Sequence, residues 1–340
     1  MRNGLWIGLA AAIVAGTIAA PPSAAQPAAA PFPLGKPVSI FVGTAPGGTN
    51  DQIMRIVARH IGKYLPGNPT IIPRNMPGAG GRQVASYLTN QAPRDGTEFA
   101  NFLRGIVLDP MLLDPKLTYR PNDLLWLGSP SGSTDLCMSW HTSRFKTLED
   151  ARKQQMIIAA VGAETVRIGL LQRLTGIDLK IVTGYPGGSQ ANLAVERGEA
   201  DSRCGASWEA IKSNYPAWIK ETPVNILLQF ALKRHPELPH VPTIAEFARN
   251  DLDRDALKVL LLPQTMGFPF AAPPGLLPEV QTMLREAFDK VWKDAGFLED
   301  ATRFQLDVFP ISGAELQGLV KDAFTASSEA IQHAKNLVEP

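Results

Sequence analysis

Short apolar runs in this chain alternate with longer segments whose apolar residues recur at helical spacing. The run 38–43, VSIFVG, is typical of a buried strand. Segment 50–64 follows it, and Ile53, Ile56 and Ile61 fall on one face of the helix that this spacing predicts. This alternation indicates βαβ units and a parallel sheet, which places the chain in the α/β class.

The same alternation continues along the chain. The predicted strands are 69–75, 97–103, 135–140, 156–162, 179–185 and 225–232, and the predicted helices are 81–91, 142–154, 165–176, 187–200 and a longer stretch over 278–305 that breaks near Gly296. Ligands of parallel sheets bind at the carboxyl ends of the strands. The loops that lead from strands into helices are therefore where we expect a site.

The first 25 residues have the layout of a secretory signal peptide. Arg2 precedes an apolar run over 5–20, and the small residues that follow predict cleavage after Ala25. A membrane anchor is the alternative, but a proline pair ends the run short of a span of about 20 residues. We therefore expect a periplasmic protein with a flexible mature N-terminus over 26–35.

Composition narrows the functional classes. The 340 residues include 33 lysines and arginines against 32 aspartates and glutamates, and loss of Arg2 with the signal peptide leaves a neutral chain. A neutral chain gives no support for a nucleic-acid partner. Roughly 315 mature residues exceed one comfortable core, so about two domains are expected. No later apolar run approaches the roughly 18 residues that predict a membrane helix.

The chain has two cysteines, Cys137 and Cys204. Their wide separation excludes a Cys-x-x-Cys redox or zinc motif. An exported chain meets an oxidising compartment, which favours a structural disulfide over the alternative of two separately buried thiols.

Glycine-rich turns stand at three places where a predicted strand leads into a predicted helix. They are APGGTND at 45–51, NMPGAGG at 75–81 and GYPGGSQAN at 184–192. The first turn of a helix leaves unpaired N–H groups and carries partial positive charge, so each junction is a candidate anion site. Capping alone would explain one such turn, whereas three indicate a shared ligand cleft. Thr49, Asn50 and Ser189 can add side-chain donors or cap their helices.

Recognisable catalytic and cofactor motifs are missing from the sequence. No glycine-rich turn matches a nucleotide P-loop or a dinucleotide fingerprint, so no cofactor is predicted. GSPSG at 128–132 has the wrong spacing for a nucleophile elbow. The five histidines show no metal-ligand spacing, and no carboxylate pair can be nominated. The protein is therefore predicted not to be an enzyme.

Two arginines adjoin the predicted binding loops. Arg82 directly follows the second glycine turn, and Arg104 follows the strand predicted at 97–103. A guanidinium at this edge of a sheet can hold a carboxylate with two parallel hydrogen bonds. A surface salt bridge is the alternative for each of them, and Arg104 is the stronger candidate for the cleft.

An ordered set of segments resembles one known family. These segments are VSIFVGTAPGGTNDQIMRIVARHI, PTIIPRNMPGAGG, APRDGT, GYPGGSQANLAVERGEAD, HVPTIAEF and FPFAAPPGLLPEVQTMLREAF. Together they resemble the Bug-type, TctC-like periplasmic solute receptors of tripartite tricarboxylate transporters, over nearly the whole mature chain. The resemblance implies a type II periplasmic binding protein fold, in which two α/β domains close like a flytrap around a central cleft.

The resemblance also implies a ligand, a partner and a binding set. A monomer would bind a small organic carboxylate and pass it to a membrane permease of two subunits. The binding residues would be Gly47, Gly48, Thr49, Asn50, Gly78, Ala79, Gly80 and Gly81 in domain 1, with Arg104 beside them, and Thr165, Tyr185, Gly187, Gly188 and Ser189 in domain 2. We expect domain 1 to comprise 36–135 and 236–340, and domain 2 to comprise 136–235.

The sequence departs from the family pattern near the expected cleft. Met76 stands where arginine is usual, while Arg82 and Arg104 stand where small polar residues are usual. The added guanidinium groups lead to the hypothesis of a multiply charged or unusually shaped carboxylate. Two other functions stay open: a receptor that presents its ligand to a membrane kinase, and an exported α/β hydrolase, for which no nucleophile and base are assembled by spacing.

Overall fold

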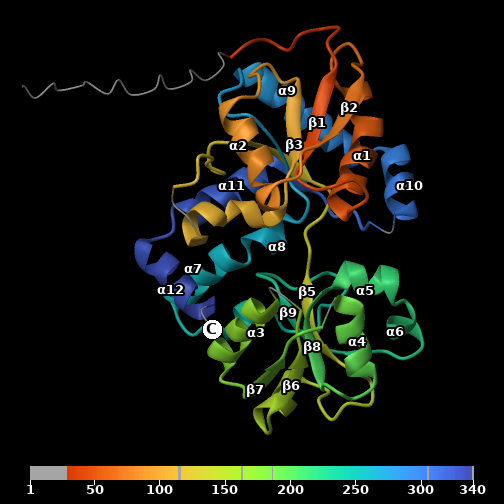
Figure 1. Ribbon diagram of the computed structural model, residues 1–340, viewed down its shortest axis with the longest axis vertical. Helices are drawn as coiled ribbons and strands as arrows, with labels where there is room; N and C mark the ends of the chain where they lie inside the picture. The colour runs from red at the N-terminus through yellow and green to blue at the C-terminus, as the bar shows by residue number, and fades with distance from the viewer. Residues whose placement is uncertain (1–28, 114–115, 162–163, 186, 305, 339–340) are drawn as a thin grey trace, which may run out of the picture.

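The computed structural model describes residues 29–113, 116–161, 164–185, 187–304 and 306–338. The signal peptide expected at 1–25 lies outside these residues. The described chain forms two lobes, each built on its own β-sheet with helices packed against it (Figure 1). The two-lobed α/β architecture predicted for the chain is confirmed.

The first lobe contains a six-stranded sheet in the order β11-β4-β10-β3-β1-β2. Its strands are β1 (Val38–Val42), β2 (Ile71–Asn75), β3 (Glu98–Asn101), β4 (Leu125–Ser129), β10 (Phe270–Ala272) and β11 (Ile311–Ser312). Strand β1 pairs in parallel with both β2 and β3, whereas β10 runs antiparallel between β3 and β4. The sheet is therefore mixed, and the prediction of a parallel sheet holds only for the part built from the first βαβ units.

The second lobe contains a five-stranded sheet in the order β7-β6-β8-β5-β9. Its strands are β5 (Asp135–Ser139), β6 (Met156–Ala159), β7 (Leu179–Val182), β8 (Ser202–Ser207) and β9 (Asn225–Phe230). Strand β6 pairs in parallel with β7 and β8, and β5 runs antiparallel to β8 and β9. Helix α4 precedes β8 along the chain, and β8 pairs in parallel with β6, but the polar composition of β8, SRCGAS, does not show the apolar pattern of a buried strand.

Helices cover both sheets. They are α1 (Thr49–Ile61), α2 (Arg82–Asn90), α3 (Glu164–Thr175), α4 (Gly188–Glu196), α5 (Trp208–Asn214), α6 (Ala217–Lys220), α7 (Asp251–Leu260), α8 (Leu262–Met266), α9 (Pro278–Val291), α10 (Ala295–Arg303), α11 (Gly313–Phe324) and α12 (Ser328–Val338). The helix predicted within 142–154, with Thr147 as its N-cap and Asp150 three residues on, is one 3-10 turn, Leu148–Arg152, and the predicted capping box between Thr147 and Asp150 is present. The break predicted near Gly296 lies slightly earlier, where Asp294 caps α10.

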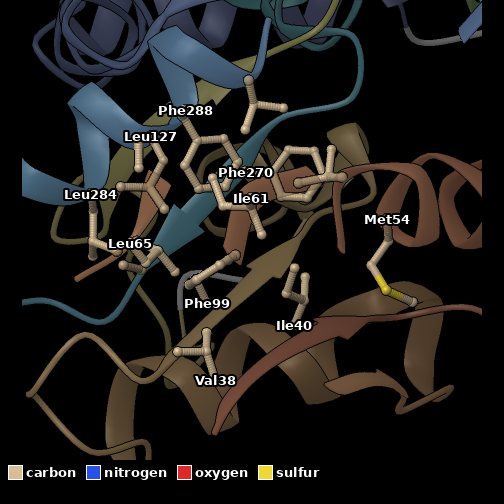
Figure 2. Packing of buried hydrophobic residues seen from close by; sticks show 14 of the residues in the cluster. Val38, Ile40, Met54, Ile61, Leu65, Phe99, Leu127, Phe270, Leu284 and Phe288 are labelled. Atoms are coloured by element: carbon tan, nitrogen blue, oxygen red, sulfur yellow. The ribbon is translucent and has the colours of Figure 1, made fainter. Parts of the chain in front are cut away.

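The apolar face predicted for 50–64 forms one side of the main core of the first lobe. Ile53, Ile56 and Ile61 on α1 are buried with Ile40 of β1. Phe288 of α9 packs on the same cluster, with rings of other aromatic residues around it, as Figure 2 shows. Burying side chains of this size stabilises a fold by about 1.5–3 kcal/mol each, so this face anchors the loop that precedes α1.

The packing divides the chain differently from the expected boundaries. The chain passes into the second lobe between β4 and β5 and returns between α7 and α8 (Figure 1). Ile244 and Leu257, which were assigned to domain 1, are buried in the core of the second lobe, as are Ala334 and Leu337 of α12. The reason is that α12 packs on α3 and α7, so the last helix belongs by its contacts to the second lobe.

Cys137 and Cys204 form a disulfide, as predicted. They are directly paired residues of β5 and β8, and both side chains are fully buried. The bond therefore joins two neighbouring strands in the centre of the second sheet rather than two distant loops.

Candidate functional site

A cavity of about 560 Å³ lies between the lobes and is lined from both sides. The first lobe contributes Thr49 and Asn50 from the start of α1 and Arg104 from the loop after β3, and the second lobe contributes Ser207 and Glu209 around the start of α5. A second cavity of about 540 Å³ shares Ser207 with the first and extends along the start of α4. Small-molecule sites have volumes of about 300–1,000 Å³, so either space can hold a metabolite.

The loop APGGTND is held in place by the carboxylate of Asp51. This buried side chain accepts hydrogen bonds from the amide of Gly47 at 2.8 Å, from Asn75 at 2.8 Å and from Arg55 at 3.0 Å. Burial raises the pKa of Asp51, but the hydrogen bonds from Arg55, Gly47 and Asn75 outweigh it and leave the pKa below its usual range. The amide of Gly47, predicted as a ligand donor, is thus occupied by the protein itself.

The two glycines of this loop serve different needs. Gly47 has φ +94°, a conformation that L side chains rarely adopt, whereas Gly48 has φ −76° and is the N-cap of α1. A Cβ atom added at Gly48 would meet nothing within 4 Å. Conformation therefore explains the glycine at 47, while at 48 the missing side chain leaves clear space in front of the helix N-terminus.

Asn50 fixes the start of α1 to the end of β3. Its side-chain amide donates to Asn101 at 2.8 Å and to the carbonyl of Phe102 at 3.3 Å. Asn101 in turn donates to the carbonyl of Phe268, which also lines the cavity. The polar residues at the carboxyl ends of β1 and β3 are thus joined into one wall, as expected for this edge of a sheet.

The second glycine turn lies beside the first but does not line either cavity. Gly81 packs so closely on Gly43, at the end of β1, that a Cβ atom there would lie 2.7 Å from it. Gly78, Ala79, Gly80 and Gly81 all have positive φ, and the amide of Gly81 donates to the carbonyl of Gly78. The turn is therefore a tight backbone support for the first loop, and a direct contact with a ligand stays a prediction.

The two candidate arginines have different surroundings. Arg82 donates to Asp109 at 2.7 Å and is not among the cavity residues. Arg104 is half-buried, lines the cavity, and makes no hydrogen bond or ion pair with any residue that the structure describes. The hypothesis that two added guanidinium groups select a multiply charged ligand is weakened, because only one of them faces the cavity.

The loops predicted for the second wall converge on an internal ion pair. Arg203 of β8 is buried and donates to Glu164 of α3 at 2.7 Å, to the side chain of Asn192 and to the carbonyl of Gly188 at 3.2 Å. Glu164 also accepts from the amide of Val161 at 2.9 Å. The guanidinium of Arg203 thus lies at the N-terminus of α4, where an anionic ligand was expected.

Glu209 is a cavity residue that pattern analysis missed. It stands in the first turn of α5, directly after β8, and it accepts long hydrogen bonds from Ser133 at 3.5 Å and from the amide of Thr134 at 3.4 Å. Burial raises the pKa of Glu209, and the nearby carboxylate of Asp135 acts in the same direction. The resemblance implied a binding segment after Asp201, but it did not single out Glu209 within that segment.

The predicted binding residues fall into three groups. Thr49, Asn50 and Arg104 line the cavity between the lobes. Gly188 and Ser189 line the adjoining cavity. The others are not among the residues that line either cavity: Gly47, Gly48, Gly78, Ala79, Gly80, Gly81, Thr165, Tyr185 and Gly187. Gly47 and Gly48 nevertheless belong to the exposed loop that leads to Thr49.

The described residues contain no group of three or more histidine, cysteine, aspartate or glutamate side chains that could hold a metal ion. In the same part of the chain, no helix has both the length and the apolar character needed to cross a bilayer.

The chain is similar in sequence to two UPF0065 proteins. Comparison with protein-family models gives no match. A UPF0065 protein of Cupriavidus necator is 26% identical over 315 residues, which cover 89% of this chain and 88% of that protein. A UPF0065 protein of Agrobacterium vitis is 26% identical over 273 residues, covering 77% of this chain and 73% of that protein.

Several solved structures share the fold of this chain although their sequence identity to it is low. A TctC solute-binding protein from Polaromonas superposes with a TM-score of 0.71 at 17% identity, covering 89% of this chain and 98% of that one. This chain has the fold of a TctC-type solute-binding protein. The TctC-type fold is shared by the periplasmic binding protein BugD, with a TM-score of 0.56 at 20% identity, covering 91% of this chain and 99% of BugD. MatC from Rhodopseudomonas palustris, solved with bound malate, gives 0.54 at 22% identity, covering 89% and 99%. The neighbours with the TctC-type fold are binding proteins and not enzymes.

Proposed function

We propose that this protein is a periplasmic receptor that captures a small organic carboxylate between its lobes. The observation that carries the proposal is Arg104, a guanidinium with no partner among the described residues, at the edge of the interdomain cavity. It lies in the same wall as the N-terminus of α1, where Thr49 and Asn50 line the cavity. A charged donor and a helix N-terminus in one wall favour an anion.

Relatives with this fold support the chemical class. MatC was solved with malate, and a second protein from Rhodopseudomonas palustris was solved with adipate. The second of these superposes with a TM-score of 0.57 and covers 89% of this chain and 98% of that one. Closure would follow if the ligand binds the closed arrangement of the lobes better than the open one, since only differential affinity shifts such an equilibrium.

A contact between the lobes lies close to the cavity. Lys212 of α5 reaches Asp307 of the first lobe at 2.6 Å and Glu237 of the second lobe at 2.7 Å. Phe304 and Leu306, in the same segment as Asp307, line the cavity. This segment connects the bound ligand to the approach of the lobes in the proposed mechanism.

Delivery to a two-subunit membrane permease of the tripartite tricarboxylate type is the finer part of the proposal. It rests on the resemblance of the sequence segments and on the export expected from residues 1–25. Presentation of the ligand to a membrane kinase is the second candidate. Transport of the labelled ligand into cells that express the two permease subunits, with and without this receptor, distinguishes the two.

The test of carboxylate capture combines native mass spectrometry with calorimetry. Freshly purified protein is expected to release a carboxylic acid on denaturation, and a panel of small carboxylates is then titrated. Arg104→Ala is expected to weaken binding by about 10- to 100-fold, because a hydrogen bond to a charged group contributes about 1.5–3 kcal/mol. Arg120→Ala removes the same charge from an exposed position of the first lobe and serves as the control. Equal affinity of Arg104→Ala and wild type for every ligand would contradict the proposal.

A further inference from the structure

Most charges near the cavity are already compensated within the protein. Arg203 is paired with Glu164 at 2.7 Å, and Arg167 is paired with Asp135 at 3.3 Å. Two charges at the cavity are not compensated among the described residues. One is the guanidinium of Arg104 in the first lobe, and the other is the carboxylate of Glu209 in the second lobe.

Glu209 has no cationic partner among the described residues. No lysine, arginine or histidine of that part of the chain lies within ion-pair distance of it; its bonds from Ser133 and Thr134 are 3.5 and 3.4 Å long, and its own amide and the hydroxyl of Ser207 are the other donors near it. A half-buried carboxylate with weak donors is costly, because the lost hydration is not replaced. A donor that arrives with a ligand would recover this free energy, and a second carboxylate would increase the cost.

The lining of this cavity is partly apolar. Leu103, Phe268, Phe304 and Leu306 contribute to it. Ser133 and Ser207 add hydroxyl groups near Glu209. The cavity is therefore lined by an unpaired cation from the first lobe, by apolar side chains able to accommodate a carbon chain, and by a carboxylate with hydroxyl groups near it from the second lobe.

We infer that the ligand is a carboxylate that carries a hydrogen-bond donor, an ammonium or hydroxyl group, at its other end. This inference rests on the proposed carboxylate receptor function and deepens it. The carboxylate is bound by Arg104 and the start of α1, and the donor group is bound by Glu209 with Ser133 and Ser207. A dicarboxylate of the same length is disfavoured, since its second carboxylate would lie against Glu209. The selectivity thus depends on one wall supplied by each lobe.

A different use of the same two charges is a direct ion pair between Arg104 and Glu209 when the lobes close. In that case Glu209 would act on closure and not on the ligand. Replacing Glu209 would then change the affinity for all carboxylates by the same factor, whatever group stands at their far end. The selectivity among ligands, and not the affinity for one ligand, separates these two roles.

The experiment compares ligands that differ only at the far end. For chains of three to six carbons, the unsubstituted carboxylate, the dicarboxylate, the terminal hydroxy acid and the terminal amino acid are titrated calorimetrically. Wild type is expected to bind the amino or hydroxy acid about 10-fold or more tighter than the dicarboxylate of equal length. Glu209→Gln, which keeps the size and the acceptor oxygen, is expected to abolish this preference while the unsubstituted carboxylate still binds. Glu221→Gln, at an exposed position of the same lobe, is the control and leaves the preference intact.

The outcomes separate this inference from the function on which it rests. If the dicarboxylate binds tightest, or Glu209→Gln changes all affinities equally, the inference is wrong, but an Arg104-dependent carboxylate receptor remains. If no carboxylate binds to wild type, and native mass spectrometry finds a ligand without a carboxylate, the proposed function fails as well. A melting temperature of Glu209→Gln equal to or above that of wild type shows that any lost preference is not a folding defect.

Discussion

The N-termini of α1 and α4 begin in the same way and end up in different surroundings. Each follows a glycine-rich turn after a strand; the start of α1 lines the cavity between the lobes, and the start of α4 lines the adjoining cavity of the second lobe. In front of α1, the position of a Cβ atom on Gly48 is open. In front of α4, a Cβ atom on Gly188 would lie 2.8 Å from the guanidinium of Arg203. The start of α1 therefore has no side chain against it at Gly48, whereas the guanidinium of Arg203 lies against the start of α4 and lines the adjoining cavity with it.

The difference shows that a glycine-rich helix start is a condition for an anion site and not sufficient for one. The local pattern supplies unpaired amides and space at both places. Whether the space stays open is decided by a side chain from another strand, here Arg203 of β8. The walls also differ in charge, because the first leaves Arg104 unpaired and the second pairs Arg203 with Glu164.

The largest expected effect on stability comes from breaking the ion pair between Arg203 and Glu164. Arg203→Met leaves Glu164 buried without its cation, which is expected to destabilise the protein by about 3–5 kcal/mol in urea unfolding. Adding Glu164→Gln to the same variant should restore much of this stability, because no unpaired charge remains. A single variant that unfolds at the same urea concentration as wild type would show that the pair is not compensating a buried charge.

The loop before α1 depends on the carboxylate of Asp51 for its conformation. Asp51→Asn removes the charge that holds Gly47, Arg55 and Asn75, and it is expected to cost about 1–3 kcal/mol. Because the folded state lowers the pKa of Asp51, its contribution is present above the usual carboxyl pKa and is lost as the pH falls through the lowered value. The stability difference between wild type and Asp51→Asn, measured by urea unfolding from neutral to acidic pH, should therefore shrink at the acidic end. A difference that stays constant with pH would contradict this role.

A pair of alanine variants compares the two helix starts directly. Gly188→Ala should displace the guanidinium of Arg203 and cost about 1 kcal/mol of stability. Gly48→Ala should leave stability within about 0.5 kcal/mol of wild type, since its Cβ meets nothing and its φ is accessible to alanine. Gly48→Ala adds a methyl group directly before Thr49 and Asn50, which line the cavity between the lobes, so it is expected to weaken binding of the proposed carboxylate, measured by calorimetry. If the two variants lose stability and affinity in the same proportion, the starts of α1 and α4 do not differ in the way proposed.

The smallest effect is expected at the contact between the lobes. Lys212→Met removes the link from α5 to Asp307 in the first lobe, and partly exposed ion pairs contribute about 0.2–1 kcal/mol. Ligand affinity should fall by less than about 5-fold, while small-angle scattering of the ligand-free protein should show a more open average shape. Lys220→Met, at an exposed-surface position of the same lobe, is the matched control. An unchanged scattering profile for Lys212→Met would show that this contact does not bias the approach of the lobes.

Elements whose local sequence agrees with the face they bury are predictable from the sequence. The helix after β1 was predicted from Ile53, Ile56 and Ile61, and these residues are buried as expected. The disulfide was predicted from the two cysteines and the expected export, and it joins neighbouring strands. Both predictions depend on properties that the residues carry with them, namely apolar spacing and cysteine chemistry in an oxidising compartment.

Pattern analysis failed where partners distant in sequence decide the outcome. Strand β8 tolerates polar residues in the sheet because partners from other elements bond to them. Ser202 donates to the carbonyl of Met138, Arg203 donates to Glu164, and Cys204 is bonded to Cys137. The segment after Asp201 is predicted from the resemblance, whereas the place of Glu209 within it depends on how β8 packs. The helix α12 packs on α7 and α3, contacts that nothing in its own sequence indicates.

The sequence by itself determined the α/β class, the glycine-rich helix starts, the disulfide and the candidacy of Arg104. The tertiary structure decided which of those helix starts stays open, which arginine remains unpaired and which acid faces the cavity from the other lobe. The physical reason is that backbone conformation and burial patterns are encoded over a few neighbouring residues. The compensation of a buried charge depends instead on which distant side chain reaches it, and at this cavity that choice separates Arg203 from Arg104.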